Sequence, residues 1–158
     1  MTLLSDLYGA GSGGGGGFST CVIARVDTKD DDVTGDGTYY NLTGSSWTEI
    51  EDNNNDFSNG TFTAPATGVY QISGVIGLSG ITSSHTLGQI IVGIAGSTYA
   101  PWNFNPYSMV TGIMLNVPFS YSYNMDADDT CTVRVKLSGG TKVVDIRTDT
   151  TFFVSRLL

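Results

Sequence analysis

Residues 62–73 read Phe62-Thr63-Ala64-Pro65-Ala66-Thr67-Gly68-Val69-Tyr70-Gln71-Ile72-Ser73, and this stretch joins a rigid turn to an apolar strand. Pro65 restrains the backbone where the chain enters the turn, because its ring fixes φ. Gly68 is expected to permit a tight exit from the turn. The apolar residues that follow predict a buried central strand, and they are Val69, Ile72, Val75, Ile76 and Leu78.

Three segments, in the right order, carry a resemblance to a known family. Residues 62–70 match an aromatic-x-Ala-Pro-x-x-Gly-aliphatic-Tyr motif, and residues 125–133 look like the family's turn into a late strand, with Asp128 where glycine is usual. Residues 151–158 are similar to its closing strand, which ends on a small residue and two leucines. The chain thereby resembles the globular head of complement component 1q, within the tumour-necrosis-factor-like trimeric jelly rolls.

The resemblance covers residues from about 18 to 158. It implies an all-β fold, an antiparallel jelly-roll β-sandwich. It also implies a homotrimer, because domains of this family pack three around an axis through an apolar sheet face. Function needs its own argument, since one fold hosts many functions.

The first strand of the domain is apolar on both faces. Cys21, Ile23 and the aliphatic part of Arg25 alternate with Val22, Ala24 and Val26. Since successive side chains of a strand point to opposite faces, the pattern predicts a strand that is covered on both sides.

Two segments are predicted to be loops. Residues 30–37 combine Asp30, Asp31, Asp32 and Asp36 with two glycines and favour a polar turn. Residues 99–107 form an aromatic, proline-marked segment. Its Trp102, Phe104 and Tyr107 are candidate partner contacts, because aromatic residues are enriched at interfaces. The alternative is that this loop folds back on its own sandwich.

A later strand separates large rings from small polar groups. Phe119, Tyr121 and Tyr123 alternate with residues 120, 122 and 124, which are serine, serine and asparagine. The rings are expected to pack in the core. The small polar face is then free to contact a neighbouring subunit or water.

The composition fits one domain with an acidic surface. The chain has 158 residues, 7 Lys+Arg and 15 Asp+Glu, a net charge of -8 and a charged fraction of only 14%. Its length is enough to bury a substantial core without disulfide bridges. Nucleic acid and anionic membranes are unfavourable partners for such a chain. No apolar run is long enough to span a bilayer.

Residues 1–17 differ from the rest and are predicted to be an N-terminal arm, with the jelly-roll domain at 18–158. The arm carries four apolar anchor candidates, Leu3, Leu4, Leu7 and Tyr8, before a glycine run. Composition alone also fits a disordered linker. The start of the chain lacks the basic residues and long apolar core of a signal peptide, so we expect synthesis and retention in a cytoplasm.

The sequence contains no recognisable arrangement of catalytic residues. His85 is the single histidine, and its Ser-Ser-His-Thr setting is typical of a surface turn. Cys21 and Cys131 fall in predicted strands, where buried thiols are usually inert. We therefore expect no enzyme, no catalytic residue and no organic cofactor.

The two acidic clusters suggest calcium binding, and some head domains of the family bind calcium. The first cluster lies within residues 30–36, and the second is Asp126, Asp128 and Asp129. Neither fits the twelve-residue calcium loop, because counting from Asp30 places Asn41 where a bidentate glutamate is needed. Solvated turn acids are the simpler interpretation, so no metal site is assigned.

The leading hypothesis is a virion structural protein, a trimeric decoration or cement protein of a bacteriophage capsid. Assembly would take place in the host cytoplasm. The head would sit on the shell while residues 1–17 clamp capsid subunits. Three arms on one trimer would act together through high effective concentration.

Two alternatives stay open. In the first, the protein is a receptor-binding knob or fibre tip whose loop around Trp102 and Tyr107 binds a host glycan or protein. No coiled-coil heptads supply a shaft, so such a knob would sit directly on its platform. In the second, the chain is a cellular binding module of the same fold with a small ligand.

Overall fold

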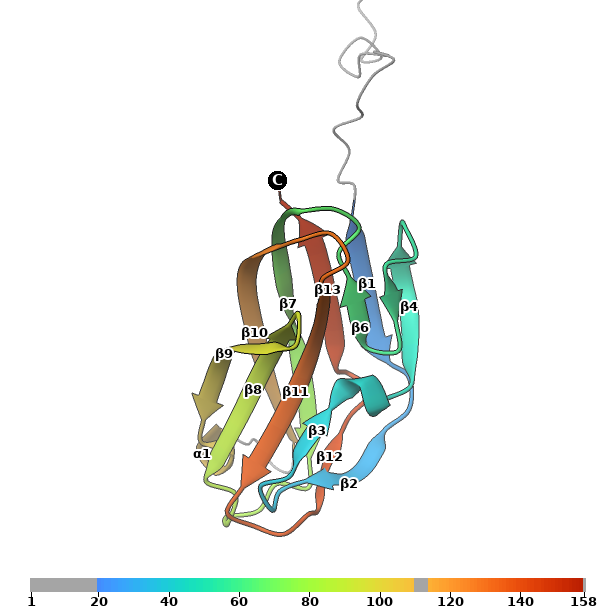
Figure 1. Cartoon of the computed structure of the whole chain (residues 1–158). Helices are drawn as coiled ribbons and strands as arrows, with labels where there is room; N and C mark the ends of the chain where they lie inside the picture. The colour runs from blue at the N-terminus through green and yellow to red at the C-terminus, as the bar shows by residue number, and fades with distance from the viewer. Residues whose placement is uncertain (1–19, 110–113, 158) are drawn as a thin grey trace, which may run out of the picture.

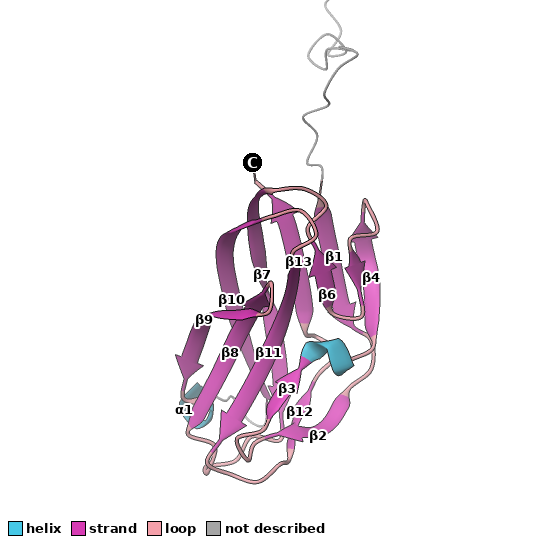
Figure 2. Cartoon of the chain, viewed as in Figure 1, coloured by secondary structure: helices cyan, strands magenta, loops and turns pink. Residues whose placement is uncertain are grey.

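The computed structural model describes residues 20–109 and 114–157, and almost all of them form strands or short connections (Figure 2). The elements in chain order are β1 (Cys21–Val26), β2 (Asp30–Thr34), β3 (Tyr39–Asn41), the 3-10 helix η2 (Leu42–Gly44), β4 (Trp47–Asp52), β5 (Phe57–Ser58), β6 (Thr61–Thr63), β7 (Gly68–Ser79), β8 (Leu87–Ile94), β9 (Ser97–Phe104), α1 (Pro106–Met109), β10 (Met114–Met125), β11 (Thr130–Ser138), β12 (Val144–Ile146) and β13 (Thr151–Arg156). The expected all-β class is confirmed.

The strands form two antiparallel sheets that pack face to face (Figure 1). The seven-stranded sheet has the order β2-β12-β7-β13-β1-β4, with β10 paired to β7. The six-stranded sheet has the order β5-β6-β11-β8-β9, with β3 paired to β11. The largest fully buried apolar side chains come from both sheets and η2: Tyr70, Phe62, Leu42, Ile72, Ile76, Leu78, Ile90, Ile94, Met125, Leu137 and Ile146. These side chains form the core between the two sheets. The two sheets form the jelly-roll sandwich that the sequence predicted.

Residues 62–73 carry the chain from one sheet to the other. Phe62 lies on β6 in the six-stranded sheet, and Tyr70 lies on β7 in the seven-stranded sheet. Their rings meet across the core at 5.5 Å, and the Tyr70 hydroxyl donates to the carbonyl of Ala66 at 2.6 Å. The predicted central strand is confirmed, since β7 pairs with β10 on one side and with β13 and β12 on the other. Gly68, however, begins β7 opposite Met125 and is not among the glycines with a positive φ.

The late turn takes its shape from Asp128. This residue has a φ of 68°, in the left-handed region that glycine adopts most easily. Its amide donates to the carbonyl of Ala64 at 2.8 Å, and the Ala64 amide donates to the carbonyl of Asp129 at 2.8 Å. The two motif turns are therefore hydrogen-bonded to each other. Asp128 accepts the backbone conformation that the family pattern usually gives to glycine.

The predicted loop at 30–37 is partly a strand. Residues Asp30–Thr34 form β2 at the edge of the seven-stranded sheet, where β2 pairs with β12 through an irregular register. The amide of Asp32, which has a φ of 53°, donates to the Asp145 carboxylate at 3.0 Å. Three aspartates suit an edge strand, because their charge discourages pairing with another sheet. The strand was missed because its partners lie more than a hundred residues away.

The predicted aromatic loop at 99–107 was also wrong in part. Ser97–Phe104 form strand β9 at the edge of the six-stranded sheet, and only the end of the segment enters the short helix α1. Pro101 had favoured a loop. It lies in β9 between Tyr99 and Trp102, where the register with β8 shifts. Proline is tolerated at edges and bulges because no ladder hydrogen bond needs its missing N–H.

The first strand is covered on one face only within the chain. Val22, Ala24 and Val26 are buried, whereas Cys21 and Ile23 on the opposite face are half-buried. Within the single chain, the prediction of a strand covered on both sides therefore holds only for the face that packs against the core.

Candidate functional site

The predicted partner-binding residues fall in three places. Leu3, Leu4, Leu7 and Tyr8 lie outside the described residues. Trp102 and Phe104 lie on β9, where they are partly buried against the core, which is the alternative in which this segment folds back. Tyr107 lies on α1 with 52% of its surface exposed.

An aromatic edge closes the sandwich between β9 and β10, and we define it by Tyr99, Trp102, Tyr121 and Tyr123. The rings of Tyr99 and Tyr123 lie 4.7 Å apart, and Tyr121 stacks on Tyr123 at 6.1 Å. Trp102 meets Tyr121 edge-on at 6.4 Å. The Tyr123 hydroxyl donates to the Tyr99 hydroxyl at 3.0 Å, and this hydrogen bond raises the pKa of Tyr123. All four rings are partly buried, so the edge combines apolar surface with hydroxyl groups.

The outer face of the seven-stranded sheet is the second exposed surface. Strand register aligns Ile23 of β1 with Phe153 of β13, then with Ser73 of β7 and Ser120 of β10. Ile23 and Phe153 are half-buried, and Ser120 is exposed. We call this line the Phe153 row. It places apolar groups at the middle of the face and small hydroxyls toward β10.

Gln71 forms hydrogen bonds with the serines on the β10 side of this face. The Gln71 amide donates to Ser120 Oγ at 2.5 Å and its carbonyl oxygen accepts from Ser122 Oγ at 2.7 Å. The small polar side chains that alternate with the rings of β10 therefore face away from the core, as the sequence predicted. Phe119 is buried, and Tyr121 and Tyr123 pack against the core as expected.

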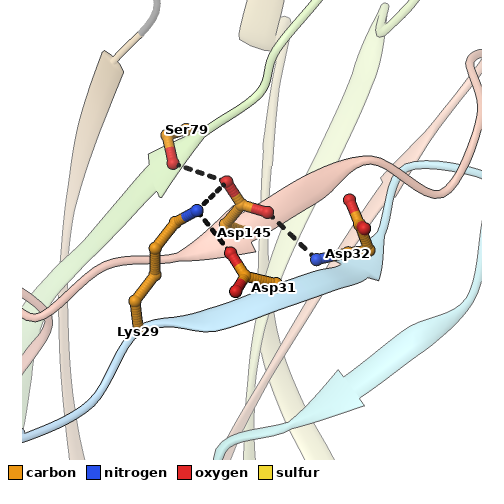
Figure 3. A network of polar contacts seen from close by, with 5 residues as sticks. All are labelled: Lys29, Asp31, Asp32, Ser79 and Asp145. Atoms are coloured by element: carbon orange, nitrogen blue, oxygen red, sulfur yellow. Dashed lines mark hydrogen bonds and ion pairs between the residues drawn. The ribbon is translucent and has the colours of Figure 1, made fainter.

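A charged network lies at the β2 edge of this sheet (Figure 3). One Asp145 oxygen accepts from Lys29 at 2.8 Å and from Ser79 at 2.9 Å, and the other accepts from the Asp32 amide. Lys29 also contacts Asp31. A cleft of about 450 Å³ lies beside the network and is lined in part by Met114 and Arg147.

The pKa values in the network follow from these contacts. Burial raises the pKa of Asp145, but the hydrogen bonds from Lys29, the Asp32 amide and Ser79 outweigh it and leave the pKa below its ordinary value. The hydrogen bonds to Asp145 and Asp31 raise the pKa of Lys29. Both groups stay charged at neutral pH and tie β2 to β12 and β7. The carboxylate is committed to these donors, which is the arrangement of a structural network rather than a general base.

His85 is buried, contrary to the predicted surface turn. Its exposed fraction is 0%, and its Nδ1 accepts the amide N–H of Thr82 at 2.9 Å. The Nε2 nitrogen then carries the proton and donates to the carbonyl of Thr141 at 3.1 Å. The ring fits because Gly35 and Gly140 leave space where a Cβ would collide with it. The sequence alone does not signal this burial, because Gly35 and Gly140 meet the ring only in the folded chain. With both ring nitrogens in hydrogen bonds, the imidazole is not free for acid–base chemistry.

The cysteines and acidic clusters likewise lack a catalytic or metal-binding arrangement. Cys131 is buried, which raises the pKa of its thiol to about 12, and Cys21 is half-buried. In the second acidic cluster, Asp129 accepts the Asp126 amide at 2.9 Å. No group of three metal-binding side chains occurs among residues 20–109 and 114–157. Within the same residues, no helix has the length and apolar composition of a membrane span.

Comparison with known proteins gives the fold an independent test. No family model and no curated protein sequence matches the chain. Among solved structures, murine APRIL at pH 8.0 aligns with a TM-score of 0.61 and 10% identity, over 87% of this chain and 98% of that one. The globular domain of zebrafish complement 1qA protein aligns with a TM-score of 0.59 and 14% identity, over 89% of this chain and 98% of that one. The chain therefore has the complement-1q and tumour-necrosis-factor-like jelly-roll fold, and at these identities the likeness is one of fold.

Proposed function

We propose that the chain is a non-catalytic head module that functions as a homotrimer. The observation that carries this proposal is the Phe153 row, in which Ile23 and Phe153 remain half-exposed in the single chain. An apolar centre bordered by small serines suits close packing against another subunit. Stable interfaces bury about 800 Å² per partner, so we expect the interface to include the aromatic edge as well as this face.

A three-fold arrangement would bring two different surfaces together. The aromatic edge of one subunit would contact the outer face of the next, which is a heterologous contact that closes when repeated around an axis. Tyr99 and Tyr123 would supply hydroxyls at the rim, and Phe153 would supply the apolar centre. The resemblance to trimeric jelly rolls supports this geometry.

The non-catalytic role is supported by the state of the polar groups. His85 is buried and engaged at both nitrogens, the Asp145 carboxylate is committed to three donors, and Cys131 is buried. Histidine, carboxylate and thiol side chains are common catalytic groups. Each of them instead holds the fold together.

The specific form that we propose is a virion decoration protein, assembled in the host cytoplasm. The support comes from the sequence: residues 1–17 combine four apolar anchors with a glycine run, and the head is acidic with few charges. In the described part, Thr20 lies beside Arg156, because the Arg156 amide donates to the Thr20 carbonyl at 3.2 Å. The arm would therefore leave the head beside the C-terminal strand, and three arms on one trimer would bind a shell with avidity.

A receptor-binding knob is the second candidate, and the position of Tyr107 favours it. Helix α1 lies at the end of the sandwich opposite the C-terminus (Figure 1), and Tyr107 is exposed there. A head that is attached through its N-terminal end would present α1 outward. In this candidate, Tyr107→Ser abolishes adsorption to the host cell while attachment to the particle survives.

Sedimentation tests the assembly. A Ser120→Arg variant places a large charged side chain on the hydroxyl side of the Phe153 row without touching the core. Ser58→Arg, on β5 of the other sheet, is the matched control. We expect trimers for the unmodified protein and the control, and folded monomers by circular dichroism for Ser120→Arg. A monomeric unmodified protein, or a trimeric Ser120→Arg variant, would contradict the proposed interface.

Co-sedimentation tests the virion role. The full chain and a variant that lacks residues 1–17 are mixed with undecorated particles from the source preparation. We expect the full chain to pellet with particles and the shortened chain to remain in solution as a folded trimer. Binding of the shortened chain at full strength would refute the arm as a clamp.

A further inference from the structure

Charge is divided unequally between the two sheets. None of the strands β3, β5, β6, β8, β9 and β11 contains an aspartate or glutamate. The strands of the seven-stranded sheet contain Asp30, Asp31, Asp32, Glu49, Glu51, Asp52 and Asp145. The six-stranded sheet nevertheless carries two cations, Arg134 and Lys136, both on β11. In a chain with a net charge of -8, one whole sheet is therefore free of carboxylates and locally positive.

Both cations face outward from the sandwich. Along β11, Val133 and Val135 are buried, and Arg134 and Lys136 alternate with them. Side chains two residues apart on one strand lie about 7 Å from each other on the same face. Neither cation forms a salt bridge with a described residue. Both side chains are half-buried, and their charges have no carboxylate partner among the described residues.

Strand register places Lys136 in a row of polar groups across four strands. Lys136 lies opposite Tyr39 of β3 on one side and Gln89 of β8 on the other, and Gln89 lies opposite Asn103 of β9. With neighbouring strands about 4.8 Å apart, the row spans roughly 14 Å. We call it the Tyr39 row.

Contacts between neighbours hold the row in order. The ammonium of Lys136 lies 4.7 Å from the centre of the Tyr39 ring. The Tyr39 hydroxyl donates to Gln89 Oε1 at 3.5 Å, and Gln89 Nε2 donates to Asn103 Oδ1 at 2.8 Å. Tyr39 keeps 49% of its surface exposed, so the ring remains open to a ligand.

Arg134 adds a second point of positive charge beside the row. It lies opposite Asn41 of β3, and its Nη2 donates to Thr98 Oγ1 of β9 at 3.1 Å. The hydrogen bond orients the guanidinium while leaving further N–H donors, because the group has five. Asn41 is exposed and adds an amide to the same surface.

We propose that this outer face of the six-stranded sheet binds an acidic saccharide. The Tyr39 ring can pack against the C–H face of a sugar, because an aromatic face is electron-rich. Lys136 and Arg134 can bind a carboxylate or sulfate on the same or a neighbouring sugar. The side-chain NH2 groups of Asn41 and Asn103 can donate to sugar hydroxyls, whereas their Oδ1 atoms already accept from the Thr43 amide and from Gln89 Nε2.

An acidic saccharide fits this face better than a polyanion does. The net charge of -8 repels nucleic acid at long range, whereas a short saccharide with one or two anionic groups meets only the local field of Arg134 and Lys136. The site lies within one chain and on the sheet opposite the Phe153 row. It therefore does not depend on trimer formation or on a virion role.

Titration of short saccharides tests the proposal. The probes are 3′-sialyllactose and 6-sulfated lactose, each beside neutral lactose, measured by calorimetry and saturation-transfer NMR with the full chain. We expect an acidic probe to bind, lactose to bind at least tenfold more weakly, and added salt to weaken the acidic interaction. The monomeric Ser120→Arg variant should bind as well as the trimer, which separates this site from the proposed assembly.

Matched variants locate the site. Lys136→Gln and Tyr39→Ser should each weaken acidic binding at least tenfold, and circular dichroism verifies that they fold. Lys142→Gln and Ile50→Ser remove an exposed lysine and an exposed apolar side chain elsewhere, the latter on β4 of the other sheet, and should leave binding unchanged. The proposal is overturned if neither acidic probe binds, if lactose binds equally well, or if the control variants lose binding as strongly as the Tyr39 row variants.

Discussion

Tyr70 connects the turn that defines this fold to the core, and its two contributions can be measured separately. Its ring is fully buried and meets Phe62 of the other sheet, while its hydroxyl donates to the Ala66 carbonyl at 2.6 Å. Tyr70→Phe removes the hydrogen bond and keeps the ring. Tyr70→Ala removes both.

The expected magnitudes differ enough to be resolved. Tyr70→Phe leaves the Ala66 carbonyl without its donor, which costs about 1–2 kcal/mol of unfolding free energy. Tyr70→Ala also opens a cavity between the sheets and should cost about 3–5 kcal/mol, as for other buried aromatic residues. For a chain of this length, each kcal/mol lowers the melting temperature by about 2–4 °C.

Urea unfolding followed by tryptophan fluorescence measures both variants, because Trp47 and Trp102 pack against the core. All samples are compared at one protein concentration, since assembly would stabilise the folded state. Tyr107→Phe, at an exposed tyrosine, is the control and should be unchanged. If Tyr70→Phe is as stable as the unmodified protein, or as unstable as Tyr70→Ala, the hydrogen bond does not have the separate role assigned to it.

Three further predictions test the charged network, the late turn and the buried thiol. Asp145→Asn should lower the unfolding free energy by about 1–3 kcal/mol at pH 7. Because the folded-state pKa of Asp145 is lowered, this difference is present above about pH 4 and shrinks as the pH falls through that lowered value. Urea titrations at several pH values would show this change. Asp128→Gly should raise stability by about 0.5–1 kcal/mol, since glycine adopts the φ of 68° without steric cost, and a less stable variant in the same assay would disprove this account of the turn. Cys131 should resist thiol reagents at pH 8 until the protein is unfolded, because burial raises its pKa to about 12; mass spectrometry that finds it modified in the folded protein would contradict this.

The parts of the fold that the sequence predicted are those with local causes. The central strand β7 begins directly after a proline turn and continues as an apolar run, and the rings of β10 alternate with small polar residues. Both patterns lie within one strand and its own turn. Local rules therefore suffice for them.

The parts that were missed depend on contacts far along the chain. Strand β2 is held by Asp145, which lies 113 residues from Asp32. His85 is buried because Thr141 supplies an acceptor and Gly140 leaves room for the ring. In both cases a polar segment looks like a loop by itself and becomes ordered only when its distant partner is in place.

Neither candidate surface is visible in a single strand either, because each is a row that register creates across several strands. The Phe153 row joins residues 23, 153, 73 and 120, and the Tyr39 row joins residues 39, 136, 89 and 103. The alternation that fills the core with apolar side chains also sends every second residue outward. A sandwich thus has two outer faces whose chemistry can differ, and here one sheet contains carboxylates while the other contains none. In the assembly and binding that we propose, that separation would let one face pack against neighbouring subunits while the opposite face stays open to a ligand of opposite charge.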